Sequence, residues 1–422
     1  MRPPPERGRP SSSPGPEAVR GPRLLLAGAS VRALARSALA GTTARARFPG
    51  GILAVDYFGD ADLEGESRLT PVAIGRDLGL PRTTAGLGRA LLRLAAAGAT
   101  WDALAWAGGL ENRPALLRRL SRVCPLLGNE PGAVAAVRNT PLVFAALDEA
   151  RLRHPEAPGL EAAPRDGRHW LFKRVRRAGG HGVRPAAPGE PRRPGEYLEE
   201  FLEGVAGSAA FVADGRQARL LGASEQLVPP GAPASPFRYA GNIAGPIEEI
   251  LSPAERAAIE RAADVLTGRF GLRGLNGLDY IRTPGGPALL EVNPRFTASM
   301  EILEEIACVS FFDLHLQALA GALPACPEAG AAWMGKEILY ADAAVEAPSP
   351  EALEPLGVRD RPHRGERFEA GQPLCTLIVT APGRAACRTA LQARGREVRS
   401  LFRRSRVIGL DVPHLRGKRL HG

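Results

Sequence analysis

The chain has few aromatic residues and little cysteine, and each shortage argues against a class of protein. Aromatic residues make up only 5% of the 422 residues, so the stacking platforms used by proteins that bind single-stranded nucleic acid are scarce. The five cysteines are scattered and include no Cys-x-x-Cys pair. This spacing argues against a disulfide framework or a zinc site and is typical of a reducing compartment. We therefore expect a cytoplasmic protein.

Long apolar runs are also missing. No segment offers about 18 uninterrupted apolar residues, so we expect neither a transmembrane helix nor a membrane partner. Residues 1–22 consist mainly of Pro, Arg, Ser and Gly and are followed by no apolar signal region. We expect this segment to be a disordered tail rather than a secretory signal.

Positive charge is in excess, with a formal net charge of +10. The basic residues are spread along the whole chain and form no stripe, so we predict no nucleic-acid partner. Nearly all of them are arginines, and Lys173, Lys336 and Lys418 are the only lysines. These three positions therefore call for a functional explanation.

The length predicts two or three domains, and the hydrophobic content of 44% is sufficient to form their cores. Residues 23–132 are expected to form a Rossmann-like domain, because apolar runs at 23–30 and 52–57 flank a segment with helical spacing at 31–40. The first run ends in Gly-Ala-Ser at residues 28–30 rather than in Gly-x-Gly-x-x-Gly. We therefore interpret this domain as a scaffold without a bound dinucleotide.

A glycine-rich turn at 108–112 follows an expected strand at 101–107 and precedes a helix that begins at Pro114. Turns in this position often bind ligands in open α/β sheets. The sequence favours equally a ligand-binding turn that carries Glu111 and Asn112 and an ordinary turn with a helix cap.

Residues 133–325 are expected to form a larger α+β domain, followed by a small α+β domain at 326–403 and a basic tail at 404–422. In the larger domain we predict helices at 140–152, 253–270 and 300–320, and strands at 170–173, 197–202, 207–212, 218–226, 278–281 and 288–293. Ser252 and Gly271 are typical of the N-cap and the C′ position of the 253–270 helix. In the small domain we predict strands at 335–340, 374–379 and 398–402, and a helix at 384–394.

The two strands at 278–281 and 288–293 are joined by a turn at Thr283–Pro287. Side chains alternate along a strand, so Glu291 and Asn293 share a face, and Asp279 joins them if the strands pair. Two carboxylates and an amide oxygen suit Mg²⁺. Arg295 follows and can clamp a phosphoryl group through two hydrogen bonds. The alternative interpretation is a hairpin with an ordinary polar face.

Lys173 ends a strand just before a loop that contains Gly179, Gly180 and Gly182. A lysine in this position reaches nucleotide phosphates, and the backbone N–H groups of a glycine loop cover them. A surface lysine before a flexible loop is the alternative. The acidic strand at 198–204 can bind adenine through its main chain, and a glutamate at its end can bind ribose hydroxyls.

The order of these features, from Lys173 and the glycine loop to Glu-x-Asn-Pro-Arg at 291–295, resembles the ATP-grasp superfamily over about residues 135–320. Four segments resemble the predicted ATP-dependent carboligases related to biotin carboxylase: 198–204, 222–226, 241–243 and 360–365. The resemblance implies an α/β chain with a Rossmann-like first domain, a two-lobed α+β ATP-grasp domain and a small α+β domain at the end.

The resemblance also implies roles for individual residues. Lys173 and Arg295 are expected to be catalytic, the first on the inner phosphates and the second on the transferring phosphoryl group. Asp279, Glu291 and Asn293 are expected to hold Mg²⁺ or Mn²⁺. The expected nucleotide contacts are Lys173, Gly179, Gly180, Gly182, Glu199, Glu200, Phe201, Leu202 and Glu203. Many family members have an additional lysine near residue 140, and it stays open whether Arg138 replaces it.

We therefore expect an ADP-forming carboxylate–amine ligase that uses ATP and Mg²⁺, with small molecules as partners. A carboligase that uses bicarbonate is an alternative, although the chain contains no Met-Lys-Met biotin motif. Joining glutamate to an amine for a one-carbon coenzyme is another. The non-enzymatic alternative is a basic nucleic-acid-binding protein on a decayed ATP-grasp fold. The sequence does not identify the carboxylate or the nucleophile, and it does not decide whether the chain forms a homodimer.

Overall fold

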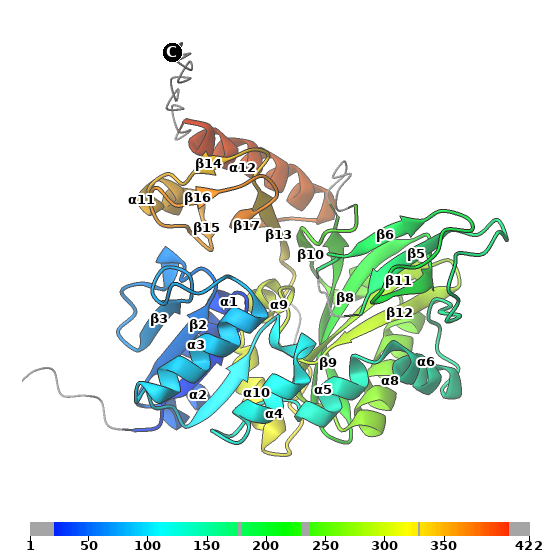
Figure 1. Cartoon of the computed structure of the whole chain (residues 1–422), viewed down its shortest axis with the longest axis horizontal. Coiled ribbons are helices and arrows are strands. Elements are labelled where there is room, and N and C mark those ends of the chain that lie inside the picture. The colour runs from blue at the N-terminus through cyan, green and yellow to red at the C-terminus, as the bar shows by residue number, and fades with distance from the viewer. Residues whose placement is uncertain (1–20, 176–178, 229–235, 328–329, 405–422) are drawn as a thin grey trace, which may run out of the picture.

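The computed structural model describes residues 21–175, 179–228, 236–327 and 330–404. Nearly all of the two predicted tails lies outside these residues. Within them, the strands form sheets of four, eight, three and two strands (Figure 1). No helix in this described part is long and apolar enough to cross a membrane.

The N-terminal segment forms a parallel four-stranded sheet in the order β3-β2-β1-β4. Pairing of β1 with both β2 and β4 confirms the predicted βαβ arrangement. Helices α3 and α4 pack on one face of the sheet, and α1 packs on the other. The elements are β1 (Leu24–Ala27), α1 (Arg32–Ala40), α2 (Thr42–Arg47), β2 (Ile52–Asp56), η1 (Ala61–Leu63), β3 (Leu69–Ala73), α3 (Thr84–Ala96), β4 (Ala103–Trp106), η2 (Leu110–Asn112) and α4 (Pro114–Leu120).

A long antiparallel sheet in the order β12-β11-β8-β9-β10-β13-β17-β15 forms the centre of the molecule. Its strands are β8 (Val205–Asp214), β9 (Ala218–Leu227), β10 (Gly241–Ala244), β11 (Arg273–Thr283), β12 (Gly286–Asn293), β13 (Trp333–Tyr340), β15 (Val358–Arg359) and β17 (Pro373–Ala381). Because β10 pairs with β13, the strands after residue 326 continue the same sheet. One sheet thus contains strands from both sides of the predicted domain boundary between residues 325 and 326. That boundary stays a prediction.

A separate three-stranded sheet, in the order β6-β5-β7, lies beside one end of the long sheet (Figure 1). It contains β5 (Trp170–Arg174), β6 (Val183–Ala186) and β7 (Glu196–Glu200). The two-stranded sheet is β14 (Val345–Glu346) with β16 (Arg367–Phe368). The remaining helices are α5 (Pro131–Val137), α6 (Thr140–Glu149), α7 (Ile247–Ile250), α8 (Pro253–Phe270), α9 (Met300–Ala307), α10 (Phe311–Leu319), α11 (Pro350–Leu353), η3 (Glu354–Leu356) and α12 (Arg384–Arg404).

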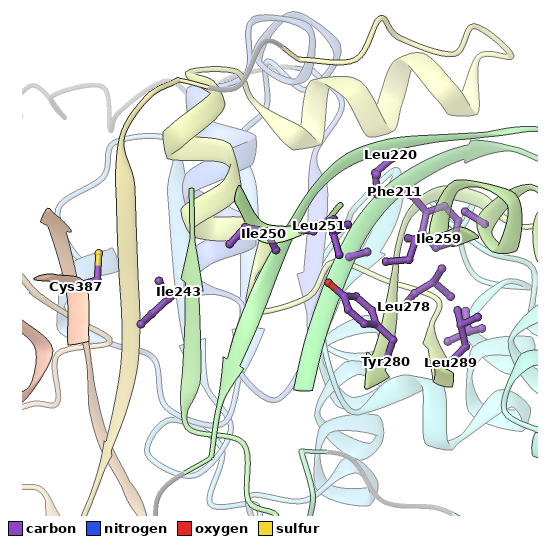
Figure 2. Close-up of a cluster of buried hydrophobic side chains, with 14 of the residues drawn as sticks. Phe211, Leu220, Ile243, Ile250, Leu251, Ile259, Leu278, Tyr280, Leu289 and Cys387 are labelled. Atoms are coloured by element: carbon purple, nitrogen blue, oxygen red, sulfur yellow. The ribbon is translucent and has the colours of Figure 1, made fainter. Parts of the chain in front are cut away.

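The long sheet has an apolar core on each face, because its side chains alternate between the two faces. Phe211, Leu278 and Leu289 meet Ile259 of α8 on one face (Figure 2). Alternate residues, such as Val212, face the apolar cluster that also contains α9, α10 and α1. Helices α9 and α10 therefore fix the long sheet against the N-terminal sheet.

Helix α8 has the predicted bounds and the predicted caps. The Ser252 hydroxyl accepts the Glu255 N–H, the Glu255 side chain accepts the Ser252 N–H, and Gly271 is left-handed with φ 67°. This reciprocal bonding satisfies backbone groups that a helix end otherwise leaves without partners.

Two predictions of secondary structure are wrong. Residues 398–402 form the last turns of α12 and not a strand, because Leu391, Val398 and Phe402 are buried at helical spacing. The single helix predicted at 300–320 is two helices. Cys308 adopts a left-handed conformation with φ 52° after α9, and Ser310 caps α10.

Candidate active site

A cavity of about 300 Å³ lies between the three-stranded sheet and the long sheet. We call it the nucleotide cavity, because residues that the sequence predicts to contact a nucleotide line it. It is lined by eleven of the predicted site residues: Lys173, Gly179, Gly180, Glu199, Glu200, Phe201, Leu202, Asp279, Glu291, Asn293 and Arg295. Gly182 and Glu203 do not line it, and the Glu203 side chain is exposed. The roles of all these residues stay predictions.

Strand pairing places the predicted metal ligands together. Asp279 on β11 lies directly opposite Glu291 on β12, and Asn293 lies opposite Gly277. The Asn293 amide donates to Asp279 Oδ2 at 2.9 Å. Gln226 of β9 donates to Asp279 Oδ1 at 2.8 Å, a contact that sequence reasoning did not predict.

The pKa values of Asp279 and Glu291 are shifted in opposite directions. Burial, followed by the neighbouring Glu291, raises the pKa of Asp279 to about 7. Burial also opposes ionisation of Glu291, but the positive charges of Arg138 and Lys173 lower its pKa overall. Two close carboxylates repel one another, and a cation between them would remove that repulsion.

The donor set fits a hard cation such as Mg²⁺. Within the described ranges, no group of three or more His, Cys, Asp or Glu side chains could hold a metal ion. Asp279 and Glu291 would therefore need further oxygen ligands. The Asn293 amide and phosphate oxygens of a ligand are suitable, because Mg²⁺ commonly combines one or two carboxylates with substrate phosphates.

Lys173 points from β5 into the nucleotide cavity and is held by a buried partner. Its Nζ lies 2.8 Å from Glu199 Oε1, and Glu199 is 1% exposed. The Tyr197 hydroxyl donates to the other Glu199 oxygen at 3.1 Å. Burial opposes the charge of Lys173, but Glu199 raises its pKa overall. The lysine is therefore a charged and positioned group rather than a surface residue.

The glycine loop requires glycine for two reasons. Gly179, Gly180 and Gly182 have φ of 64°, 74° and 79°, in the left-handed region that other residues rarely adopt. A Cβ on Gly180 would lie 1.7 Å from the carbonyl oxygen of Phe237. The Tyr239 N–H donates to the Gly179 carbonyl at 3.0 Å. These contacts hold the loop at the edge of the nucleotide cavity.

The acidic strand is shorter than predicted, because β7 ends at Glu200. The N–H of Glu200 donates to the Glu156 carbonyl at 2.9 Å, and the N–H of Phe201 donates to His169 at 2.9 Å. Both amides are thus used within the protein. Any main-chain contact of Glu200 with adenine would have to use its carbonyl group.

The turn at residues 108–112 holds two arginines of the site. Glu111 is fully buried, and its Oε1 accepts the Arg295 Nε–H at 2.8 Å. Its other oxygen accepts the Gly109 N–H at 2.5 Å. Asn112 Oδ1 accepts from Arg138 Nη2 at 3.0 Å, and Arg138 Nη1 lies 3.3 Å from Glu291. The turn therefore positions two arginines of the candidate site, and ligand binding by the turn itself stays a prediction.

A second cavity, of about 310 Å³, adjoins the first. We call it the acceptor cavity, after the role that is proposed for it below, the binding of the molecule that accepts the activated group. Tyr239, Arg295, Thr297 and Ala298 line both cavities. The other walls come from α1, the segment after β2, β13, β17 and the loop at 360–368. Sequence reasoning missed this cavity because its walls are separated by up to several hundred residues and carry no common motif.

Comparison with known proteins agrees with this architecture. The family model described as "ATP-grasp domain" matches residues 139–299. Sequence comparison with curated proteins finds no match. Three solved structures illustrate the likeness in fold. Biotin carboxylase from Campylobacter jejuni is 13% identical, with a TM-score of 0.65, over 90% of this chain and 92% of that one.

The second is N5-carboxyaminoimidazole synthase from Aspergillus clavatus, solved with ADP and 5-aminoimidazole ribonucleotide. It is 12% identical, with a TM-score of 0.63, over 90% of this chain and 99% of that one. The third is L-amino acid ligase from Bacillus licheniformis, at 15% identity and a TM-score of 0.61, over 90% and 98%. Residues 139–299 of this chain therefore form an ATP-grasp domain, within a fold that the chain shares with these three proteins.

Proposed function

We propose that the chain is an ATP- and Mg²⁺-dependent, ADP-forming ligase that activates a small carboxylate as an acylphosphate for attack by an amine. One observation carries the proposal. Lys173 and Arg295 line the same cavity as the opposed carboxylates of Asp279 and Glu291. A polyphosphate requires cations and hard-metal ligands around one cavity.

The proposed chemistry depends on position and charge. A free carboxylate is a poor electrophile, and transfer of the terminal phosphoryl group converts it into an acylphosphate. The amine then displaces phosphate. Lys173 is expected to bind the inner phosphates, and Arg295 to stabilise the group in transfer. Mg²⁺, when bound by Asp279, Glu291 and Asn293, would neutralise phosphate charge.

The arrangement of the two cavities supports a two-substrate reaction. Arg295 lines both of them, so a group bound in the acceptor cavity lies beside the residue expected at the transferring phosphoryl group. Solved structures of the same fold include an amino acid ligase and a biotin carboxylase. The likeness supports the fold, and the choice of an amine acceptor is our own proposal.

The test is to identify the phosphate product. With a panel of small carboxylates and amines, the productive pair should release ADP and phosphate in amounts equal to the product. Hydroxylamine should trap the activated acid as a hydroxamate. Glu291→Gln should abolish turnover while the melting temperature stays near that of the unmodified protein. AMP and pyrophosphate as products would contradict the proposal, and a strict requirement for bicarbonate would favour the carboligase alternative.

Nucleotide binding is tested separately by calorimetry with ATP and Mg²⁺. Lys173→Met should weaken ATP binding, because it removes a phosphate contact. Arg192→Met should leave ATP binding unchanged, because Arg192 is paired with Glu161 and does not line the nucleotide cavity. Equal affinities for all three proteins would contradict the role of Lys173.

A further inference from the structure

The acceptor cavity is largely apolar. Its walls include Leu34, Phe58, Phe296, Ile338, Phe368 and Leu374. These side chains come from both the N-terminal and C-terminal parts of the chain. A cavity of about 310 Å³ with such walls suits a small molecule that has a hydrocarbon or aromatic body.

Most charged side chains on the cavity wall already have partners of opposite charge. Arg32 forms ion pairs with Glu301 and with Asp360, whose Oδ1 lies 2.7 Å from Arg32 Nε. Lys336 Nζ lies 2.7 Å from Glu301 and donates to the Ala298 carbonyl at 3.0 Å. Glu366 is paired with Arg82 at 2.5 Å.

Asp60 is the exception among these wall residues. It is 4% exposed and lines the acceptor cavity, and its Oδ2 is buried without a hydrogen-bond partner among the described residues. Its acidic neighbours are satisfied. Asp56 accepts three backbone N–H groups, from Val31, Phe58 and Gly59.

Asp62 is satisfied as well, because it accepts the N–H groups of Asp360 and Arg361. The negative charges of Asp360, Asp56 and Asp62 surround Asp60, and Arg32 is the cation that opposes them there. Burial together with these neighbours raises the pKa of Asp60 well above its ordinary value. A buried polar group without a partner is costly, and a ligand that supplies the missing partner would remove that cost.

We infer that the acceptor cavity binds an apolar amine, with its ammonium group against the Asp60 carboxylate and its body against the apolar walls. An ammonium group supplies the positive charge and the N–H donors that this carboxylate lacks. A divalent cation suits the place less well, because it needs several oxygen ligands and no such group of side chains exists in the described part.

The assignment names the amine substrate of the proposed ligase and in that sense rests on it. Asp60 and Arg295 line the same cavity. An amine held by Asp60 is therefore enclosed together with the residue expected to contact the transferring phosphoryl group. The ammonium group must lose a proton before its nitrogen can attack, and the adjacent Asp60 carboxylate can accept that proton because its pKa is raised. The size and apolar walls of the cavity predict that ammonia and short hydrophilic amines bind poorly.

The experiment measures binding of three matched probes to the full chain by calorimetry, without nucleotide: phenethylamine, 2-phenylethanol and phenylacetate. Phenethylamine should bind, the alcohol should bind at least tenfold more weakly, and the anion should not bind measurably. Asp60→Asn should weaken phenethylamine roughly 10- to 100-fold, because it removes a charge-assisted hydrogen bond, and should leave the alcohol unchanged.

Glu366→Gln is the matched control, because it neutralises another carboxylate on the same wall that is already paired. It should leave phenethylamine affinity within about threefold. If Asp60→Asn does not fold, the alcohol and the anion still test the charge requirement in the unmodified chain. Equal binding of amine and alcohol, or loss of amine binding in both variants alike, would overturn the inference.

ATP binding in the same variants separates this inference from the proposed function. Asp60 does not line the nucleotide cavity, so Asp60→Asn should bind ATP and Mg²⁺ as the unmodified chain does. Amine binding by a chain that binds no ATP would support the inference and contradict the ligase. ATP binding without any amine binding would contradict the inference and leave the proposed ligase standing.

Discussion

Single residues of the candidate site are oriented by side chains of the turn that follows β4 of the N-terminal sheet. Glu111 binds Arg295, which follows β12 of the long sheet, and Asn112 binds Arg138, which follows helix α5. A guanidinium held through a charged hydrogen bond keeps one direction, and this direction decides whether it meets a phosphoryl group. Glu111 is therefore expected to act on catalysis through Arg295.

Glu111→Gln should lower kcat roughly 10- to 100-fold, because Arg295 loses the anion that fixes its position. The dissociation constant for ATP should change by less than about threefold, since Lys173 and the glycine loop are unaltered. Steady-state kinetics and calorimetry measure the two effects. Glu190→Gln, which breaks an ion pair with Arg184 remote from the cavity, is the control. A mutant that loses ATP affinity and kcat equally would contradict this division of roles.

The sequence was sufficient for residues that are close together along the chain. Asp279, Glu291 and Asn293 fall on one hairpin, so strand alternation and one turn predicted their common face, and the register confirms it. The pair of Arg295 with Glu111 spans 184 residues. No local periodicity connects such positions, so this contact and the Lys336–Glu301 contact required the structure.

At the scale of elements, the glycine loop combines two constraints that a matched pair of variants can separate. Gly179 and Gly180 both have left-handed backbone angles. Among the residues that the structure describes, a Cβ at Gly179 would meet only His181, at 3.9 Å, whereas a Cβ at Gly180 would collide with the Phe237 backbone at 1.7 Å. Alanine at either position strains the backbone, but only at Gly180 must the loop also move away from residues 237–239.

Gly180→Ala should therefore weaken ATP binding much more than Gly179→Ala, by roughly tenfold or more. The melting temperatures of both variants should stay close to that of the unmodified chain, because the loop carries no part of the core. Calorimetry with ATP and scanning calorimetry of the free protein give the two quantities. Equal loss of affinity would mean that backbone angle alone matters and that the contact with Phe237 does not.

Helix α10 carries a buried histidine that joins three elements. His315 Nδ1 accepts the Leu275 N–H of β11 at 2.8 Å, and Nε2 donates to the Leu127 carbonyl at 3.2 Å. Burial lowers the pKa of His315 to about 4, against an ordinary value of 6.5. The folded state thus holds the neutral imidazole, and the unfolded chain takes up a proton first as the pH falls.

The histidine should cost stability between pH 6.5 and pH 4 and nothing further below that range. The difference of about 2.5 pKa units corresponds to about 3 kcal/mol. His315→Gln keeps a donor for Leu127 but cannot take up a proton in this range. The unfolding free energy of the unmodified chain, relative to this variant, should fall by about 3 kcal/mol from pH 7 to pH 4 in urea titrations. A gap that is independent of pH would show that the imidazole is not held neutral.

Element boundaries were predictable where local chemistry marks them. Ser252 and Gly271 marked both ends of α8, and the structure adds Glu255 to the cap at its first turn. Residues 398–402 were predicted to form a strand, because the packing of α12 against β13 and β17 cannot be seen in the local sequence. The helical spacing of the buried residues Leu391, Val398 and Phe402 outweighs any local preference of residues 398–402 for a strand.

At the scale of the whole molecule, a buried charge cluster joins the N-terminal, central and C-terminal parts. We define it as Arg32 of α1, Glu301 of α9, Lys336 of β13, and Arg359 and Asp360 after α11. Arg32 is 1% exposed and its Nη2 donates to Glu301 at 2.9 Å, across 269 residues of sequence. Glu301 also accepts from Lys336 and Arg359. The cluster borders the acceptor cavity, so the same contacts that join the parts also shape its wall.

Removal of Arg32 tests how strongly these parts are joined. Arg32→Met should lower the free energy of unfolding by about 3–5 kcal/mol, because it leaves the half-buried Asp360 and the buried Glu301 without the cation that lies between them. Arg36→Met is the control on the same helix. Arg36 also pairs with a carboxylate, Glu66, but its side chain is 44% exposed, so the change should cost less than about 1 kcal/mol.

The double variant Arg32→Met with Asp360→Asn identifies the cause of the loss. If an uncompensated carboxylate is responsible, neutralising Asp360 should restore about half of the lost stability, because the remaining anion Glu301 still has Lys336 and Arg359 as partners. Urea unfolding at one pH measures this for five proteins: the unmodified chain, the single variants Arg32→Met, Arg36→Met and Asp360→Asn, and the double variant. Additive losses would instead indicate that Arg32 stabilises the fold through packing of its side chain, and equal losses in the Arg32 and Arg36 variants would show that the charge cluster does not join the parts of the molecule.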